Sequence, residues 1–128
     1  MNQLLVVDDD NSIREMLSTF LTLEGFAVRQ ARSGDEGLEY FRNRGPFACV
    51  ISDFQMYGAV IKNGVLMLKE IRTEAPNQKC ILQSASWNLG KLLSVNGLGD
   101  IPILQKPFHL KDLMEELRKL GVASVQSV

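Results

Sequence analysis

The sequence predicts one α/β domain built on a doubly wound parallel sheet. Five apolar runs of strand length alternate with five segments that place apolar residues at helical spacing. Such strict alternation, with right-handed crossovers, buries both faces of a parallel sheet under helices. The 128 residues, 45% of them hydrophobic, suffice for one ordinary domain and its core. The expected strands are residues 4–7, 26–31, 48–52, 80–83 and 103–105, and the expected helices are residues 11–24, 34–44, 64–75, 89–95 and 110–120.

Local features mark the ends of the first elements in order. Residues 4–7 are a continuous apolar run, and the helical pattern that follows stops at Gly25. The second strand alternates apolar and polar side chains as a half-buried strand does, and Ser33 is the expected N-cap of the helix after it. Gly45 and Pro46 then end this helix.

The later elements end at residues with reactive side chains. The third strand leads to Asp53, and the helix after the following irregular stretch ends at a Pro-Asn pair. The fourth strand leads to Ser84 and the fifth to Lys106. Pro102, near the start of the fifth strand, indicates an edge strand, because proline has no N–H to pair within a ladder. The last helix has one apolar face and charges elsewhere.

Charge and composition exclude several classes of function. The 14 Lys and Arg against 15 Asp and Glu give a net charge of −1, so direct nucleic-acid binding is not expected. No apolar run approaches the roughly 20 residues that span a bilayer, and the first residues lack a basic signal-peptide start. We therefore expect a cytoplasmic protein that does not contact a membrane. Cys49 and Cys80 lie inside apolar runs, which favours buried thiols over a disulfide.

Acidic residues follow two of the strands. Asp8 and Asp9 come after the first strand and Asp53 after the third, and the carboxyl ends of parallel strands share one edge of a sheet. Crowded carboxylates have raised pKa values unless a cation neutralises them, and an all-oxygen ligand set favours Mg²⁺. Asp10 fits better as a cap of the first helix. Since GxGxxG and P-loop motifs are lacking, ligand binding depends on side chains.

A hydroxyl and an ammonium follow the last two strands. Ser84 and the small Ala85 offer a hydroxyl and an unobstructed backbone N–H to an oxyanion, although Ser84 alone is also typical of a helix cap. Lys106 precedes Pro107, and an X-Pro bond can be cis and turn the chain so that the ammonium points inward. By itself Lys106 would be interpreted as a solvated loop lysine. Together with the acids, these groups predict phosphoryl transfer to an aspartate.

Four motifs in this order resemble the response-regulator receiver domain of two-component signalling. They are Val6-Val7-Asp8-Asp9, Ile51-Ser52-Asp53-Phe54-Gln55-Met56, Ser84-Ala85 and Lys106-Pro107-Phe108. Their separations fit as well, with 44 positions from Asp9 to Asp53, 31 from there to Ser84 and 22 more to Lys106. Each motif is weak singly, but the four in register are specific and extend over nearly the whole chain.

The resemblance implies a flavodoxin-like (βα)5 fold with strand order 2-1-3-4-5. Asp53 would accept a phosphoryl group from a phosphohistidine of a histidine kinase or histidine phosphotransfer protein. Asp9 and Asp53 would bind Mg²⁺ directly, Asp8 directly or through water, and the backbone carbonyl of Gln55 would complete the protein ligands.

The resemblance also implies which groups would compensate the charge of the phosphoryl group and what kind of protein the domain would be. Ser84, the Ala85 amide and Lys106 would face the phosphoryl oxygens. The domain would be a phosphoacceptor switch and not an enzyme, with at most slow self-catalysed phosphotransfer and autodephosphorylation. Its switched surface, near the fourth helix and fifth strand, would bind a downstream effector protein or output domain. The resemblance leaves open whether phosphorylation also produces a homodimer.

Departures from the family pattern lie beside the expected site. Gln55 and Ser86 resemble the pair that tunes phosphoaspartate hydrolysis, so the resemblance leaves the lifetime open. Tyr57 stands where relatives often have proline, and residues 58–63 look like a short insertion that would alter partner docking. Ile103 occupies a position where many relatives carry Tyr or Phe. Because an aliphatic side chain cannot make the aromatic rotation, we expect a weaker or differently transmitted switch.

Two other functions are weighed against this one. Asp8 and Asp10 form an Asp-x-Asp pair that resembles haloacid-dehalogenase phosphatases, with Asp8 as nucleophile and Asp10 as acid/base. That class normally needs a further acidic motif after a later strand, and the only late candidate here, Asp100, is solitary. The second alternative is a receiver-like docking module that does not need phosphate. The receiver domain is expected to span residues 1–121, with a tail at 122–128; no output domain follows, so the chain is a stand-alone receiver or a piece of a larger protein.

Overall fold

The computed structural model describes residues 2–56, 60–86 and 88–123 and contains every element that the sequence predicts. The strands are β1 (Gln3–Val7), β2 (Ala27–Ala31), β3 (Cys49–Asp53), β4 (Cys80–Ser84) and β5 (Ile103–Gln105). The helices are α1 (Asn11–Leu23), α2 (Gly34–Arg44), α3 (Gly64–Glu74), α4 (Leu89–Val95) and α5 (Leu110–Lys119). The expected bounds agree with these or differ by one residue at an end. Asp53 and Ser84 are the last residues of β3 and β4, so each of these strands ends one residue later than the sequence predicted.

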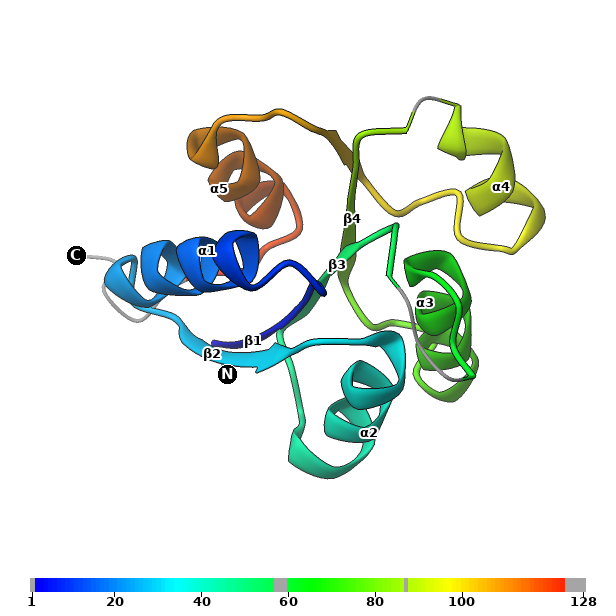
Figure 1. Ribbon diagram of the computed structural model, residues 1–128, viewed down its shortest axis with the longest axis horizontal. Helices are drawn as coiled ribbons and strands as arrows, with labels where there is room; N and C mark the ends of the chain where they lie inside the picture. Colours follow the sequence, from blue (N-terminus) through cyan, green and yellow to red (C-terminus); the bar gives the residue numbers. More distant parts are fainter. Residues whose placement is uncertain (1, 57–59, 87, 124–128) are drawn as a thin grey trace.

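All neighbouring strands pair in parallel, in the order β2-β1-β3-β4-β5. Helices α1 and α5 cover one face of the sheet, and α2, α3 and α4 cover the other (Figure 1). This confirms the doubly wound, flavodoxin-like architecture and its strand order. Strand β5 lies at an edge, as Pro102 indicates, and the carbonyl of Pro102 accepts a hydrogen bond from the Leu82 N–H at 3.0 Å.

Alternate residues of each strand supply two separate cores. In β1, Leu5 and Val7 pack on the side of α2, α3 and α4, whereas Leu4 and Val6 pack on the side of α1 and α5. All four are fully buried, as expected for a parallel sheet covered on both faces. Val122 is also buried in the core beside α1 and α5.

The helix caps follow the sequence. A carboxylate oxygen of Asp10 accepts from the Ile13 N–H at 3.1 Å, which confirms Asp10 as the cap of α1. The hydroxyl of Ser33 accepts from the Glu36 N–H at 3.1 Å and caps α2. At the end of α1, Gly25 takes a φ of 97°, a conformation that favours glycine.

Some expectations concern residues outside the described ranges, namely Tyr57, residues 58 and 59, Trp87 and residues 124–128. Both cysteines are free and buried, as predicted. In the part of the chain that the structure describes, no helix has the length and apolar character needed to cross a membrane.

Candidate functional site

Three carboxylates meet at the carboxyl edge of the sheet. The Asp8 N–H donates to the Ala31 carbonyl at 3.1 Å, which continues the ladder between β1 and β2 one residue past β1. Asp53 ends β3, the neighbouring strand. One oxygen each from Asp8, Asp9 and Asp53 lie within 4.8 Å of one another, although Asp9 is solvent-exposed and the other two are buried. The strand order therefore brings these acids together at one edge of the sheet, as predicted.

The Asp8 carboxylate is held on both oxygens. Oδ1 accepts from the backbone N–H of Asp10 at 2.9 Å, and Oδ2 accepts from Nε2 of Gln83 at 3.4 Å. Only 1% of Asp8 is exposed. Burial raises the pKa of Asp8 from 3.8 to about 6; the Asp10 N–H and Lys106 oppose the rise, and the nearby Asp53 and Asp9 charges add to it.

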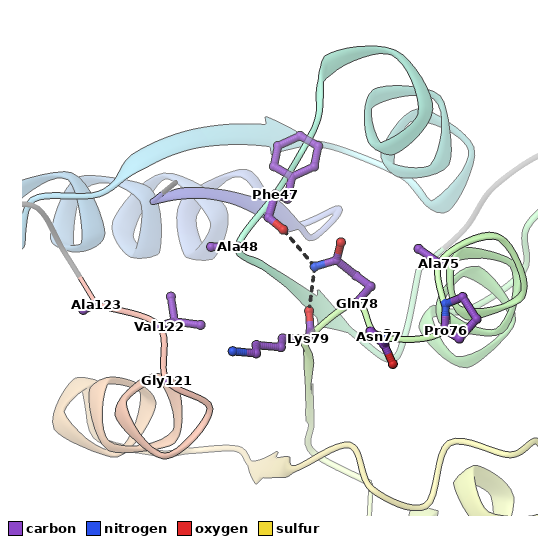
Figure 2. Close-up of a pocket in the computed structure, with 10 residues that line it drawn as sticks. All are labelled: Phe47, Ala48, Ala75, Pro76, Asn77, Gln78, Lys79, Gly121, Val122 and Ala123. Atoms are coloured by element: carbon purple, nitrogen blue, oxygen red, sulfur yellow. Dashed lines mark hydrogen bonds between the residues drawn. The ribbon is translucent and has the colours of Figure 1, made fainter.

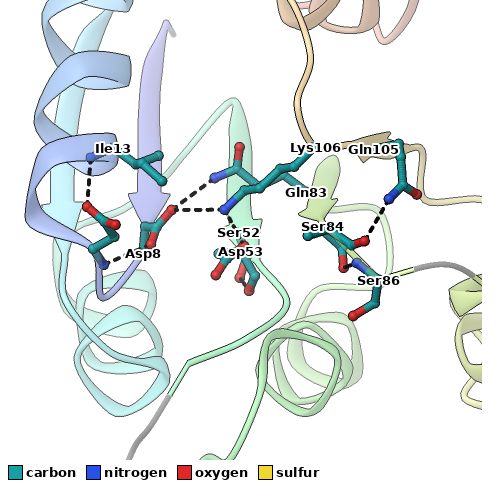
Figure 3. Close-up of polar contacts among 11 residues, drawn as sticks. Asp8, Ile13, Ser52, Asp53, Gln83, Ser84, Ser86, Gln105 and Lys106 are labelled. Atoms are coloured by element: carbon teal, nitrogen blue, oxygen red, sulfur yellow. Dashed lines mark hydrogen bonds and ion pairs between the residues drawn. The ribbon is translucent and has the colours of Figure 1, made fainter.

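Lys106 points into the acid cluster (Figure 3). Its backbone N–H donates to the Ser84 carbonyl at 2.7 Å, which places the residue directly after β5, and the peptide bond to Pro107 is cis, as the sequence allowed. Its Nζ lies 2.8 Å from Oδ1 of Asp53 and 3.8 Å from Oδ2 of Asp8. Burial raises the pKa of Asp53, and the hydrogen bond and charge of Lys106 oppose that rise. The interpretation of Lys106 as a solvated loop lysine is wrong.

Ser84 and Ala85 lie at the carboxyl end of the next strand. Ser84 is buried, and its Oγ accepts from the Ser86 N–H at 2.9 Å. It does not cap α4, whose N-cap is Asn88. Ala85 is exposed, and its carbonyl accepts from Nε2 of Gln105 at 2.9 Å. The hydroxyl and the small residue are thus both at the edge that carries the acids.

Gln55 lies two residues beyond Asp53, exposed, and pairs with Asn63 in an isolated antiparallel bridge. The chain then enters α3 at Gly64, whose N–H donates to the Phe54 carbonyl at 2.9 Å. A Cβ added to Gly64 would lie 2.2 Å from the Asp53 carbonyl oxygen. Glycine is therefore required where α3 begins, because the backbone at the end of β3 passes so closely.

Sequence reasoning missed two buried polar residues beside the acids. Gln83 is fully buried on β4, where a polar residue inside an apolar run was the available indication. Arg14 is 6% exposed; its guanidinium donates to the Asp8 carbonyl at 2.9 Å, and also to Gln30 and Asn11. Arg14 ties α1 to the loop that carries the acids, and helical periodicity gave no indication of this contact.

A hollow of about 530 Å³ lies at the opposite end of the strands, near Ala48 and Lys79 (Figure 2). The amide of Gln78 there donates to the carbonyls of Phe47 and Lys79 at 3.0 and 3.1 Å. None of the predicted site residues lines it. The acid cluster, and not this hollow, holds the groups suited to chemistry.

The five-stranded parallel fold, with acids, hydroxyl and lysine at one edge, defines a receiver-type signalling domain. The chain belongs to the response regulator receiver domain family, whose model matches residues 4–118. This confirms the resemblance that the four motifs carried. It also removes support from the phosphatase alternative, since Asp10, its expected acid/base, caps α1.

Relatives and solved structures agree with this family. The chain is 33% identical to a transcriptional regulatory protein CpxR homolog of Haemophilus influenzae over 94% of its own length and 50% of the relative. It is 31% identical to the regulatory protein AtoC of Escherichia coli over 88% of its length and 24% of that protein. The chain thus spans half or less of these curated relatives.

Among solved structures, the response regulator TrrA of Thermotoga maritima, in complex with Mg²⁺-BeF, superposes with a TM-score of 0.82 at 32% identity, covering 94% of this chain and 99% of that one. A CheY-like receiver domain protein of Methanospirillum hungatei gives 0.83 at 27% identity and 94% coverage of both chains.

Proposed function

We propose that Asp53 is the phosphoacceptor of this receiver domain. The observation that carries the proposal is the placement of Lys106 Nζ 2.8 Å from Oδ1 of Asp53, inside a cluster of three carboxylates. A phosphoryl group passes from a phosphohistidine nitrogen to this carboxylate, so that a P–N bond breaks and a P–O bond forms. The ammonium is then positioned to compensate charge on the transferred group.

The donor set fits a hard divalent cation. Asp8, Asp9 and Asp53 offer only oxygen atoms, and an exposed acid leaves room for the bound water that Mg²⁺ keeps. We propose that these residues and the backbone carbonyl of Gln55 hold Mg²⁺, which supplies charge compensation for the phosphoryl oxygens.

Other groups of the chain have defined tasks in the proposal. The Ser84 hydroxyl and the Ala85 amide bind phosphoryl oxygens from the β4 side, and Lys106 does so from the β5 side. Such transfer needs positioning more than covalent help. We therefore propose a switch with at most slow self-catalysed phosphotransfer and hydrolysis.

The proposal extends to partners and location. A histidine kinase or a histidine phosphotransfer protein donates the phosphoryl group, and an effector protein or an output domain responds to the switched surface. A homodimer formed on phosphorylation would be one form of that response. We place this protein in the cytoplasm, without direct contact to nucleic acid or membrane. We assign residues 1–121 to the receiver and 122–128 to a tail, whose first residue, Val122, still packs on the core beside α1 and α5.

Phosphorylation mapping tests the assignment. The chain is incubated with acetyl phosphate and Mg²⁺, and the acyl phosphate is located by mass spectrometry after trapping. We expect the label on Asp53, none in the Asp53→Asn variant, and loss of labelling when Mg²⁺ is chelated. A label on Asp8 would overturn the assignment.

The docking-module alternative has a separate test. A module that works without phosphate needs no cation, whereas the crowded acids of a phosphoacceptor do. Titration with Mg²⁺, followed by the fluorescence of Trp87, the one tryptophan of the sequence, distinguishes them. A saturable response supports the phosphoacceptor, and its absence favours the docking module.

A further inference from the structure

Gln83 is a polar side chain in a place that would otherwise be apolar. It lies on β4 beside Asp53 of β3 in the strand register and is fully buried. Ile81 and Leu82, the residues before it on the same strand, are fully buried and aliphatic. An aliphatic side chain at position 83 would pack without removing an amide from water, so the amide needs a physical explanation.

Half of that explanation is its contact with Asp8. Nε2 of Gln83 donates to Oδ2 of Asp8 at 3.4 Å, and this side of the carboxylate also faces Lys106 (Figure 3). The opposite orientation of the amide would set two acceptor oxygens against each other. Gln83 and the backbone N–H of Asp10 therefore hold the two oxygens of Asp8 from different directions.

The other half is an acceptor without a donor. Oε1 of Gln83 is buried and, among the described residues, has no hydrogen-bond partner. A buried carbonyl left unpaired destabilises the fold, so this oxygen calls for a donor other than the described residues, such as a water molecule. Gln83 also lines a hollow of about 440 Å³, together with Lys106 and apolar side chains of α1, which is large enough for water.

We propose that Gln83 is a positioning residue of the metal site, which fixes the Asp8 carboxylate for a divalent cation through its Nε2, while its Oε1 accepts a hydrogen bond from water in the hollow that Gln83 lines. The inference rests on the proposed function, because it presumes that the acid cluster binds a cation. It assigns a role to a residue outside the acids, hydroxyl and lysine of the four motifs. Residues that orient a metal ligand commonly change metal affinity about 10-fold or more when they are replaced.

The experiment measures Mg²⁺ affinity in the full chain. Gln83→Met removes both polar ends of the amide at nearly constant volume, and Gln83→Leu is a second variant with a different shape. Leu82→Met is the matched control, since this neighbour is equally buried but packs on the other face of the sheet. The Kd for Mg²⁺ is read from tryptophan fluorescence or calorimetry, and the thermal unfolding midpoint in EDTA reports folding.

We expect both Gln83 variants to raise the Kd about 10-fold, with Leu82→Met within twofold of the wild type. The effect of Gln83→Met must shrink below about twofold in an Asp8→Asn background, because Gln83 acts through that carboxylate. This coupling distinguishes positioning from a general loss of packing, which would persist in the Asp8→Asn chain.

The outcomes separate this inference from the proposed function. A wild-type chain with no saturable Mg²⁺ response refutes the proposed function itself. A wild-type response combined with an unchanged Kd in the folded Gln83 variants, or with an undiminished effect in the Asp8→Asn background, refutes the role of Gln83 alone. Should neither Gln83→Met nor Gln83→Leu fold, the residue is a packing requirement and the inference fails.

Discussion

Replacement of Asp8 by asparagine should stabilise the metal-free protein at neutral pH. The Asp8 carboxylate is 1% exposed, and burial is the largest cause of its raised pKa. Without a cation, the folded protein must keep an ionised group in a place poor in water. Asparagine keeps the shape of the side chain and one acceptor oxygen, and the amide of Gln83 can rotate to pair with it.

The size of the effect follows from the pKa. A rise from 3.8 to about 6, at about 1.36 kcal/mol per pKa unit, means that ionised Asp8 destabilises the folded state by about 3 kcal/mol at pH 7.5. Between pH 3.8 and about pH 6, the folded state binds more protons at Asp8 than the unfolded chain does. The wild type therefore loses stability as the pH rises through this window. At pH 4 the same calculation gives a destabilisation of the folded state by Asp8 of only about 0.5 kcal/mol.

Urea denaturation in EDTA at pH 4 and pH 7.5 measures this difference. We expect Asp8→Asn to exceed the wild type in unfolding free energy by 2 to 3 kcal/mol at pH 7.5 and by less than about 1 kcal/mol at pH 4. Asp10→Asn is the matched control, because Asp10 is exposed and asparagine also caps helices. Added Mg²⁺ should stabilise the wild type and narrow the gap at pH 7.5.

Two results would refute the reasoning. The first is an Asp8→Asn chain that is no more stable than the wild type at pH 7.5 in EDTA. The second is an equal gain at both pH values, since burial of a charge requires that the gain disappear as the carboxylate protonates.

Three further predictions concern other parts of the site. Lys106→Met should destabilise the metal-free protein by about 2 kcal/mol in urea denaturation at pH 7.5, because it removes the ammonium paired with two buried acids. The control Lys111→Met, at an exposed lysine, should have little effect. Gly64→Ala should lower the unfolding free energy by about 2 kcal/mol or more, because the added Cβ would lie 2.2 Å from the Asp53 carbonyl oxygen. Gly90→Ala should be neutral or stabilising, because an added Cβ there has no atom within 4 Å. Because Ile103 cannot rotate as an aromatic residue does, NMR shifts on addition of a phosphate analogue should stay small in α4 and β5, and large shifts confined to those elements would contradict this.

The fold was predictable because its elements depend on local patterns. Runs such as residues 4–7 are apolar throughout because a parallel sheet is covered on both faces, and caps such as Ser33 act on N–H groups three residues away. Where prediction was less accurate, at the ends of β3 and β4, the boundary depends on pairing between strands: the Phe54 N–H, for example, donates to the Gln83 carbonyl. Such long-range bonds leave no trace in local composition.

The candidate site divides in the same way. Asp8, Asp53 and Lys106 were identified because each follows a recognisable strand, and a parallel sheet brings strand ends to one edge. Gln83 and Arg14 were missed, because their importance arises from contacts with Asp8 across 75 and 6 positions of sequence.

The sequence by itself determined the order of elements, the edge at which the reactive groups would meet, and the family. Hydrophobic periodicity and helix capping depend on residues within one turn or one strand, so they can be recognised from the sequence alone. Only the tertiary structure decided that Lys106 approaches Asp53 at 2.8 Å, that Asp8 is enclosed, and that Gln83 reaches its carboxylate. These properties depend on distance and on water exclusion between segments far apart in the chain, and both are set only when the strands and helices pack together.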